Sequence, residues 1–130
     1  MIDHTGINVA NLSISKQFYE AVLSTLGYVA RLDFPDAVGF GTSNANQDDD
    51  PGGDFWIIQG APFNPRSDIA FRAANEAQVV AFYETALAAG AKDNGAPGLR
   101  PHYHKRYYAA FVFDPDGYNI EAVFHSGGAE

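Results

Sequence analysis

Three side chains that could bind a metal ion or move protons occupy matching places in this sequence. His4 lies in an alternating apolar stretch, Ile2–Val9, and Asp68 lies 64 positions later in a second such stretch. Glu121 lies in the last predicted strand, Tyr118–Phe124. Because side chains on a strand alternate between two faces, all three fall on the face opposite the apolar set. A histidine and two carboxylates are donors that divalent metals use, so we predict His4, Asp68 and Glu121 as metal ligands.

Structural explanations of these residues stay open beside the chemical one. His4 could make only a local hydrogen bond, and Asp68 could pair with Arg72, two residues along on the same strand face. Glu121 is harder to explain as a solvated surface acid, because its strand is predicted to be central. We therefore expect Glu121 to be catalytic as well as metal-binding, and Arg72 to contribute to substrate binding.

A cationic segment lies near the end of this otherwise acidic chain. Its charged and imidazole side chains are Arg100, His102, His104, Lys105 and Arg106. The two histidines could ligate one metal, or they could form a polar lid that binds an anionic substrate with Arg100 and Lys105. The lid needs less special geometry, and either His102 or His104 would then shuttle protons near neutral pH. Tyr103, Tyr107 and Tyr108 offer hydroxyls and ring faces for an aromatic or amphipathic ligand, although tyrosine is also common on strands. Of these, Tyr103 and Tyr108 are the predicted substrate contacts.

A duplicated unit must position these residues. Residues 4–28 and 68–91 both read as a strand followed by an amphipathic helix that ends in glycine, and both contain the triplet Phe-Tyr-Glu at the same offset of 64 positions. Ser13 or Ser15 is the expected cap of the first helix, and Asn75 is that of the second. The other predicted strands are Tyr28–Phe34, Ala37–Gly41, Asp54–Gln59, a poor one at Ala91–Asn94, Tyr107–Phe113 and Tyr118–Phe124, with a loop at Gly95–Pro101.

These elements predict one α+β domain, residues 1–130, of two β-α-β-β-β modules, 1–60 and 66–126. The modules are joined at Gly60–Pro65, where two prolines interrupt the pattern. A four-stranded sheet with one helix buries a single face, so the other faces of the two sheets are expected to form a half-barrel cleft.

Composition narrows the classes of partner. The net charge of −8 disfavours nucleic acid, and no segment is long and apolar enough for a membrane span or a leader peptide. The absence of cysteine excludes disulfides and fits a cytoplasmic protein. The acidic stretch Gln47–Asp54 is read as a solvated loop, since it lacks the spacing of a calcium loop.

The paired modules, the opening histidine and the closing segment Asp114–Glu121, DPDGYNIE, resemble the vicinal oxygen chelate superfamily. This superfamily includes glyoxalase I, bleomycin-resistance proteins and extradiol dioxygenases. The resemblance implies a divalent ion (Zn, Mn, Fe or Ni) held by His4 and Glu121, with Asp68 where the family commonly has histidine. The strand that ends module one offers no acid or histidine, and bleomycin-resistance relatives bind no catalytic metal.

The leading hypothesis is a metal-dependent lyase, isomerase or dioxygenase that acts on a small oxygen-chelating substrate. The alternative is a metal-free protein of the bleomycin-resistance type that binds or sequesters a small ligand. A homodimer is expected in both cases.

Overall fold

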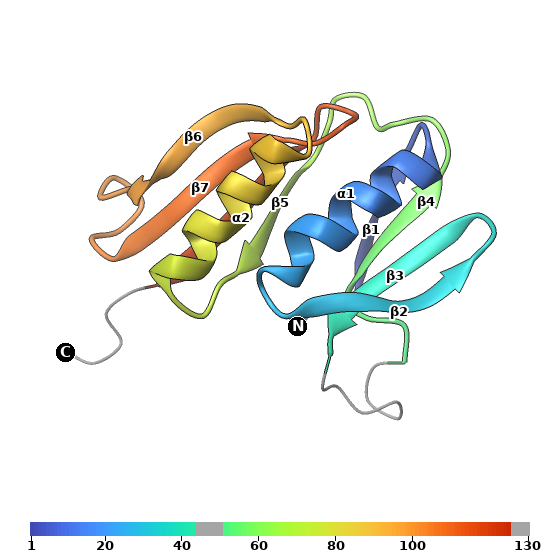
Figure 1. The fold of residues 1–130 in the computed structure, drawn as a ribbon, viewed down its shortest axis with the longest axis horizontal. Coiled ribbons are helices and arrows are strands. Elements are labelled where there is room, and N and C mark those ends of the chain that lie inside the picture. The colour runs from blue at the N-terminus through green and yellow to red at the C-terminus, as the bar shows by residue number, and fades with distance from the viewer. Residues whose placement is uncertain (44–50, 126–130) are drawn as a thin grey trace.

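The computed structural model describes residues 1–43 and 51–125, and the rest of the chain, including residues 47–50 of the acidic stretch, lies outside the described residues. Two β-α-β-β-β modules each form a four-stranded mixed sheet with one helix (Figure 1). The sheets are separate and do not close into a barrel, and the predicted α+β fold of paired modules is confirmed. The first module consists of β1 (Thr5–Val9), α1 (Leu12–Ser24), β2 (Tyr28–Phe34), β3 (Ala37–Thr42) and β4 (Phe55–Gln59). The second consists of β5 (Asp68–Arg72), α2 (Glu76–Ala88), β6 (Lys92–Leu99), β7 (Tyr107–Phe113) and β8 (Asn119–His125).

The strand order is the same in both modules. The first sheet runs β1-β4-β3-β2 and the second runs β5-β8-β7-β6. Each opening strand pairs in parallel with the closing strand of its module, and the other pairs are antiparallel. In the second sheet β8 is therefore central, and Glu121 lies opposite Ala70 on β5 and Phe111 on β7.

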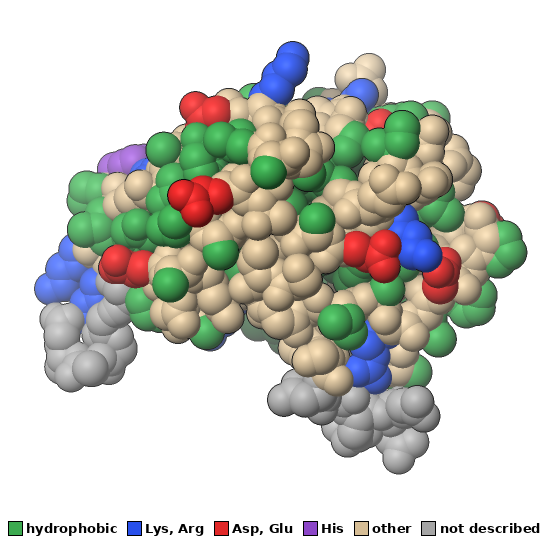
Figure 2. All heavy atoms as spheres, in the orientation of Figure 1, with side chains coloured by type: hydrophobic (Ala, Val, Ile, Leu, Met, Phe, Trp, Pro, Cys, Tyr) green, Lys and Arg blue, Asp and Glu red, His purple; other side chains and the backbone are tan. Residues whose placement is uncertain are grey.

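Each sheet buries the face that its helix covers. Ile7 and Val9 on β1 are fully buried, as are Ile120 and Ala122 on β8, because alternate residues of each strand point at the helix. The helices lie side by side and contact each other (Figure 1). Figure 2 shows the same view with side chains, where the acidic groups are scattered and form no single patch. Neither helix in the described residues is long and apolar enough to cross a membrane.

Asparagine caps both helices. The side chain of Asn75 accepts a hydrogen bond from the main-chain N–H of Gln78, as predicted. In α1 the cap is Asn11, which accepts from Ile14, so the prediction of Ser13 or Ser15 is wrong. Ser15 lies inside the helix and is buried, because its position on the helix faces the core.

Strand β6 corrects a second prediction. The loop expected from Gly95 to Pro101 is strand as far as Leu99. Pairing with β7 supplies the hydrogen bonds that this poor strand sequence would otherwise lack, and two register shifts absorb the irregular residues. One shift is at Gly95, whose φ of 148° is a conformation that favours glycine.

Buried contacts join the two modules. The Tyr19 hydroxyl on α1 donates to a carboxylate oxygen of Asp114, in the turn before β8. The rings of Phe55 and Phe71 meet edge to face with centroids 5.0 Å apart. The Tyr118 hydroxyl donates to the main-chain oxygen of Asn8 at 2.6 Å. The modules therefore share one core.

Candidate functional site

The candidate site is the face of the second sheet that points away from α2, called here the open face. Its floor is a small apolar cluster separate from the main core, made of Ala109, Phe111 and Val123 with Tyr107 packed against it. Such a floor is unusual on a sheet face without a helix, because the apolar side chains there have no partner layer. Ala109, Phe111 and Val123 are buried, with Arg100 lying over the ring of Phe111 and Tyr107 packed against the cluster.

Glu121 is the charged centre of the open face. Its side chain accepts a hydrogen bond from the hydroxyl of Tyr107. Burial raises the pKa of the Glu121 carboxyl above its ordinary value, while Tyr107 and the charge of Arg100 lower it and the charge of Asp68 raises it. Four polar side chains thus influence one another at the middle of the sheet.

Tyr107 keeps its proton at neutral pH. Burial raises the pKa of its hydroxyl, and the hydrogen bond to Glu121 raises it further. The hydroxyl therefore acts as a fixed donor, which leaves the other oxygen of Glu121 to accept from a ligand.

Arg100 is held over the floor by the main chain. Its guanidinium donates to the carbonyl oxygens of Gly98 and Ala96, both at 2.8 Å, and lies 5.3 Å from the centre of the Phe111 ring. A guanidinium has about five N–H donors, so further donors remain for an anionic group.

The turn between β6 and β7 brings imidazoles to the end of the open face. The main-chain N–H of Arg106 donates to Nδ1 of His104 at 3.2 Å, so the proton of the neutral ring is on Nε2. That Nε2 lies 2.9 Å from Nδ1 of His125, to which it donates. The predicted cationic segment thus reaches β8, where it meets His125, a residue that no pattern in the sequence singled out.

Aromatic rings line the same end of the face. The Tyr103 ring meets Tyr107 edge to face, with centroids 4.9 Å apart, and the His102 ring lies 4.3 Å from Tyr103. Tyr108 lies on the opposite face, where it packs against the main core. Tyr108 was predicted to contact the substrate, but Tyr107 is the tyrosine of this strand that lies on the open face. Tyr107 is two residues from Ala109, so the alternation of side chains along a strand places both on the same face.

The predicted metal ligands do not converge within one chain. His4 is exposed in the other module, where its Nδ1 lies 2.7 Å from a carboxylate oxygen of Asp3. It lies at a broad hollow of about 800 Å³ over the first sheet, whose wall includes Trp56. Among residues 1–43 and 51–125, no group of three or more His, Asp or Glu side chains is placed to hold a metal ion. The described residues of a single chain therefore do not fit a divalent ion, and the metal stays a prediction.

Comparison with known proteins defines the class of protein. The sequence matches the family model of the Glyoxalase/Bleomycin resistance protein/Dioxygenase superfamily over residues 1–122. No curated protein matched the chain. The chain belongs to this superfamily, as the closing segment and the paired modules indicated.

Solved structures agree with this assignment. A glyoxalase/bleomycin resistance protein from Albidiferax ferrireducens is 27% identical, with a TM-score of 0.74 over 93% of this chain and 95% of the other. A glyoxalase-related enzyme from Fulvimarina pelagi is 19% identical, with a TM-score of 0.69 over 95% of this chain and 87% of the other. A family enzyme from Burkholderia phytofirmans is 18% identical, with a TM-score of 0.67 over 95% and 98%. The last two show likeness of fold alone.

Proposed function

We propose that the protein binds a small aromatic molecule with an anionic group on the open face of the second sheet, without a metal ion. The observation that carries this proposal is the placement of Glu121, Tyr107 and Arg100 around an apolar floor on the open face. A floor for a ring, with few convergent polar groups, is the usual composition of a small-molecule site. The proposal corresponds to the bleomycin-resistance type of the superfamily.

Each group has a distinct task in this proposal. Arg100 pairs with the anionic group of the ligand, because its guanidinium is fixed by carbonyl oxygens and keeps donors in reserve. Glu121 accepts from a ligand hydroxyl or amide. The ring of the ligand packs on Phe111 and Val123, and Tyr103 closes the end of the face.

The test uses 3-phenylpropanoate, titrated into protein with labelled methyl groups. We expect saturable shifts at the Val123 methyls, and about tenfold weaker binding in Arg100→Gln, since a charge-assisted hydrogen bond is lost. Arg66→Gln is the matched control, because Arg66 also donates to main-chain carbonyls and lies over a ring, that of Tyr118. Equal weakening in both variants, or no shift at Val123, would refute the proposal.

A metal-dependent enzyme is the second candidate. The observation in its favour is that Asp68 lies near enough to Glu121 for its charge to raise the pKa of that carboxyl. A third donor would have to come from elsewhere, such as His4 from a second copy of the chain. Titration of Mn²⁺, Zn²⁺ or Fe²⁺ into metal-stripped protein separates the candidates. Tighter binding by wild type than by Glu121→Gln and Asp68→Asn would replace our first proposal with this one, because oxygen-ligated ions depend on carboxylate charge.

We also propose that the protein is a homodimer. Apolar side chains on the outer face of the first sheet are exposed to solvent, with Phe34 at 48% and Ile58 at 38%, and Phe34 stacks on Trp56. Such a patch is typical of an interface. Light scattering at high micromolar concentration should give twice the chain mass of 14.0 kDa. A monomer under those conditions would contradict the proposal.

A further inference from the structure

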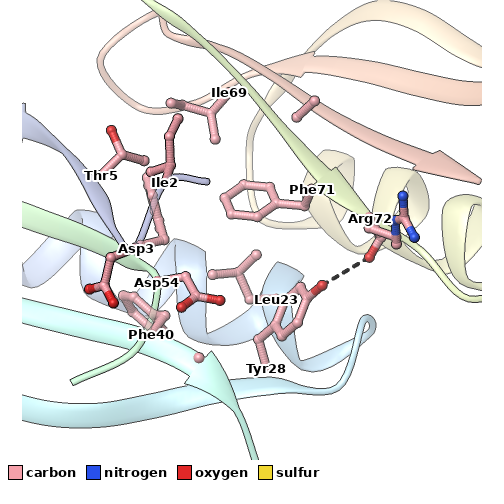
Figure 3. Close-up of a pocket in the computed structure, with 13 residues that line it drawn as sticks. Ile2, Asp3, Thr5, Leu23, Tyr28, Phe40, Asp54, Ile69, Phe71 and Arg72 are labelled. Carbon is pink, nitrogen blue, oxygen red and sulfur yellow. Dashed lines mark hydrogen bonds between the residues drawn. The ribbon is translucent and has the colours of Figure 1, made fainter. Parts of the chain in front are cut away.

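A second hollow lies where the two modules meet, away from the open face. Its walls come from α1 and all four strands of the first module and from β5 of the second, and its volume is about 260 Å³ (Figure 3). A cavity of about 150 Å³ is enough to hold benzene in a protein core. The hollow therefore has room for a single ring with a short side chain.

The inner wall of the hollow is apolar and aromatic. Phe40, Phe55 and Phe71 line it together with Leu23 and Ile69. Phe55 and Phe71 meet edge to face at 5.0 Å, and Phe40 and Phe55 are 6.4 Å apart, so the rings are already packed into a fixed wall. A ring that enters finds further edges and faces to pack against.

The mouth of the hollow carries negative charge. The carboxylates of Asp3 and Asp54 lie on one side of it, whereas the guanidinium of Arg72 points away (Figure 3). Burial raises the pKa of the Tyr28 hydroxyl most, the charge of Asp54 raises it further and the charge of Arg72 lowers it, so both charged groups act near the polar rim of the hollow. A carboxylate has about four acceptor sites, so each one can accept from an ammonium group in addition to its present partners.

We propose that this hollow is a binding site for a small aromatic or branched aliphatic amine. The apolar part of the amine lies among Phe40, Phe55 and Phe71, and its ammonium group lies at Asp3 and Asp54. The net charge of −8 favours the approach of such a cation over that of an anion. This site is independent of the ligand proposed for the open face, which carries the opposite charge and uses other residues.

A bound amine would also act on the junction between the modules. Phe55 belongs to β4 and Phe71 to β5, so one ligand touches both modules at once. A ligand that binds only the folded junction stabilises it by mass action. The melting temperature should therefore rise with the concentration of the amine.

The test compares 2-phenylethylamine with 3-phenylpropanoate, which have the same ring and opposite charge. With methyl-labelled protein, the amine should give saturable shifts at Leu23 and Ile69. The dissociation constant from these shifts should be about tenfold lower for the amine than for the acid, because the two carboxylates attract the ammonium group and repel the carboxylate of the acid. This comparison uses wild-type protein, so it does not depend on how a variant folds. Equal affinity of the two compounds at these methyls, or no saturable shift from the amine, overturns the proposal.

Variants then locate the ammonium group. Asp54→Asn should weaken binding of the amine by about threefold to fivefold, the range for a partly exposed ion pair. Asp36→Asn is the matched control, since it removes the same charge from an exposed turn that does not line the hollow. Equal weakening in both variants would mean that only the overall charge attracts the amine, and the site would be rejected. Val123 should not shift with the amine, which keeps this result separate from the test of the open face.

Discussion

Replacing Tyr19 with phenylalanine tests how the modules are held together. The Tyr19 hydroxyl is fully buried and donates to Oδ2 of Asp114, a carboxyl that is 5% exposed. The other oxygen of Asp114 accepts from the main-chain N–H groups of Asp116 and Tyr118, both at 2.9 Å. Tyr19→Phe therefore leaves one buried carboxylate oxygen without its donor, while the second oxygen keeps both partners.

The expected loss is about 2 kcal/mol of the free energy of unfolding at neutral pH, because a hydrogen bond to a buried charged group is removed and the acceptor stays. For a chain of 130 residues this lowers the melting temperature by about 7 °C. Tyr118→Phe is the matched control. It makes the same chemical change at a buried tyrosine whose hydroxyl donates to the neutral carbonyl of Asn8.

The loss of stability in Tyr19→Phe should also depend on pH, which tests whether Asp114 is the group responsible. Burial raises the pKa of Asp114 above its ordinary value, and the hydrogen bond from Tyr19 lowers it. Without Tyr19 the pKa of folded Asp114 rises further, so the variant binds a proton more readily and recovers stability relative to wild type as the pH falls. The destabilisation should shrink toward about pH 4, whereas that of Tyr118→Phe should not change.

The assay is urea unfolding followed by circular dichroism at neutral and acidic pH, with both variants and wild type. A loss smaller than about 0.5 kcal/mol for Tyr19→Phe would refute the reasoning, since it would mean that the carboxylate finds another donor. A loss that does not vary with pH would show that Asp114 is not the group responsible.

Three further predictions concern single positions. In Gly39→Ala, the new methyl group would lie 2.1 Å from the main-chain oxygen of Gly52 and 2.7 Å from the ring of Trp56. The free energy of unfolding should therefore fall by at least about 1 kcal/mol, and the fluorescence of Trp56 should change. An unaltered fluorescence spectrum would count against this prediction. Asn11→Ala removes the cap of α1 and should cost about 1 kcal/mol, measured by thermal unfolding, and a melting temperature equal to that of wild type would contradict the cap. Because the pKa of Glu121 is raised in the folded state, the wild-type protein should lose stability as the pH rises from the ordinary glutamate range toward the raised pKa. In Glu121→Gln, urea titrations should no longer show this contribution to the fall of the unfolding free energy with pH. Parallel plots of unfolding free energy against pH for the two proteins would show that Glu121 is not its source.

The helices and most strands could be predicted from the sequence because their signals are local. Alternation along Thr5–Val9 and helical spacing around Phe18 and Phe82 report which residues face a core, whatever the rest of the chain does. The same parity correctly placed Glu121 on the face away from the helix. The exception among the strands is β6, whose glycines and proline give no strand signal, because its backbone is ordered by pairing with β7.

The contacts that make up the site were decided only by the tertiary structure. The hydrogen bond from Tyr107 to Glu121 joins residues 14 positions apart on the paired strands β7 and β8. The approach of His104 to His125 joins the turn before β7 to the end of β8, 21 positions away. Contacts between the modules join still more distant residues, such as Tyr19 and Asp114, and no periodicity encodes them. The sequence therefore determined which side chains face outward from each sheet, because that follows from strand geometry alone. Whether His4 meets Glu121, and what hollow forms between Phe55 and Phe71, depends on how the two modules pack, which is a property of the whole folded chain.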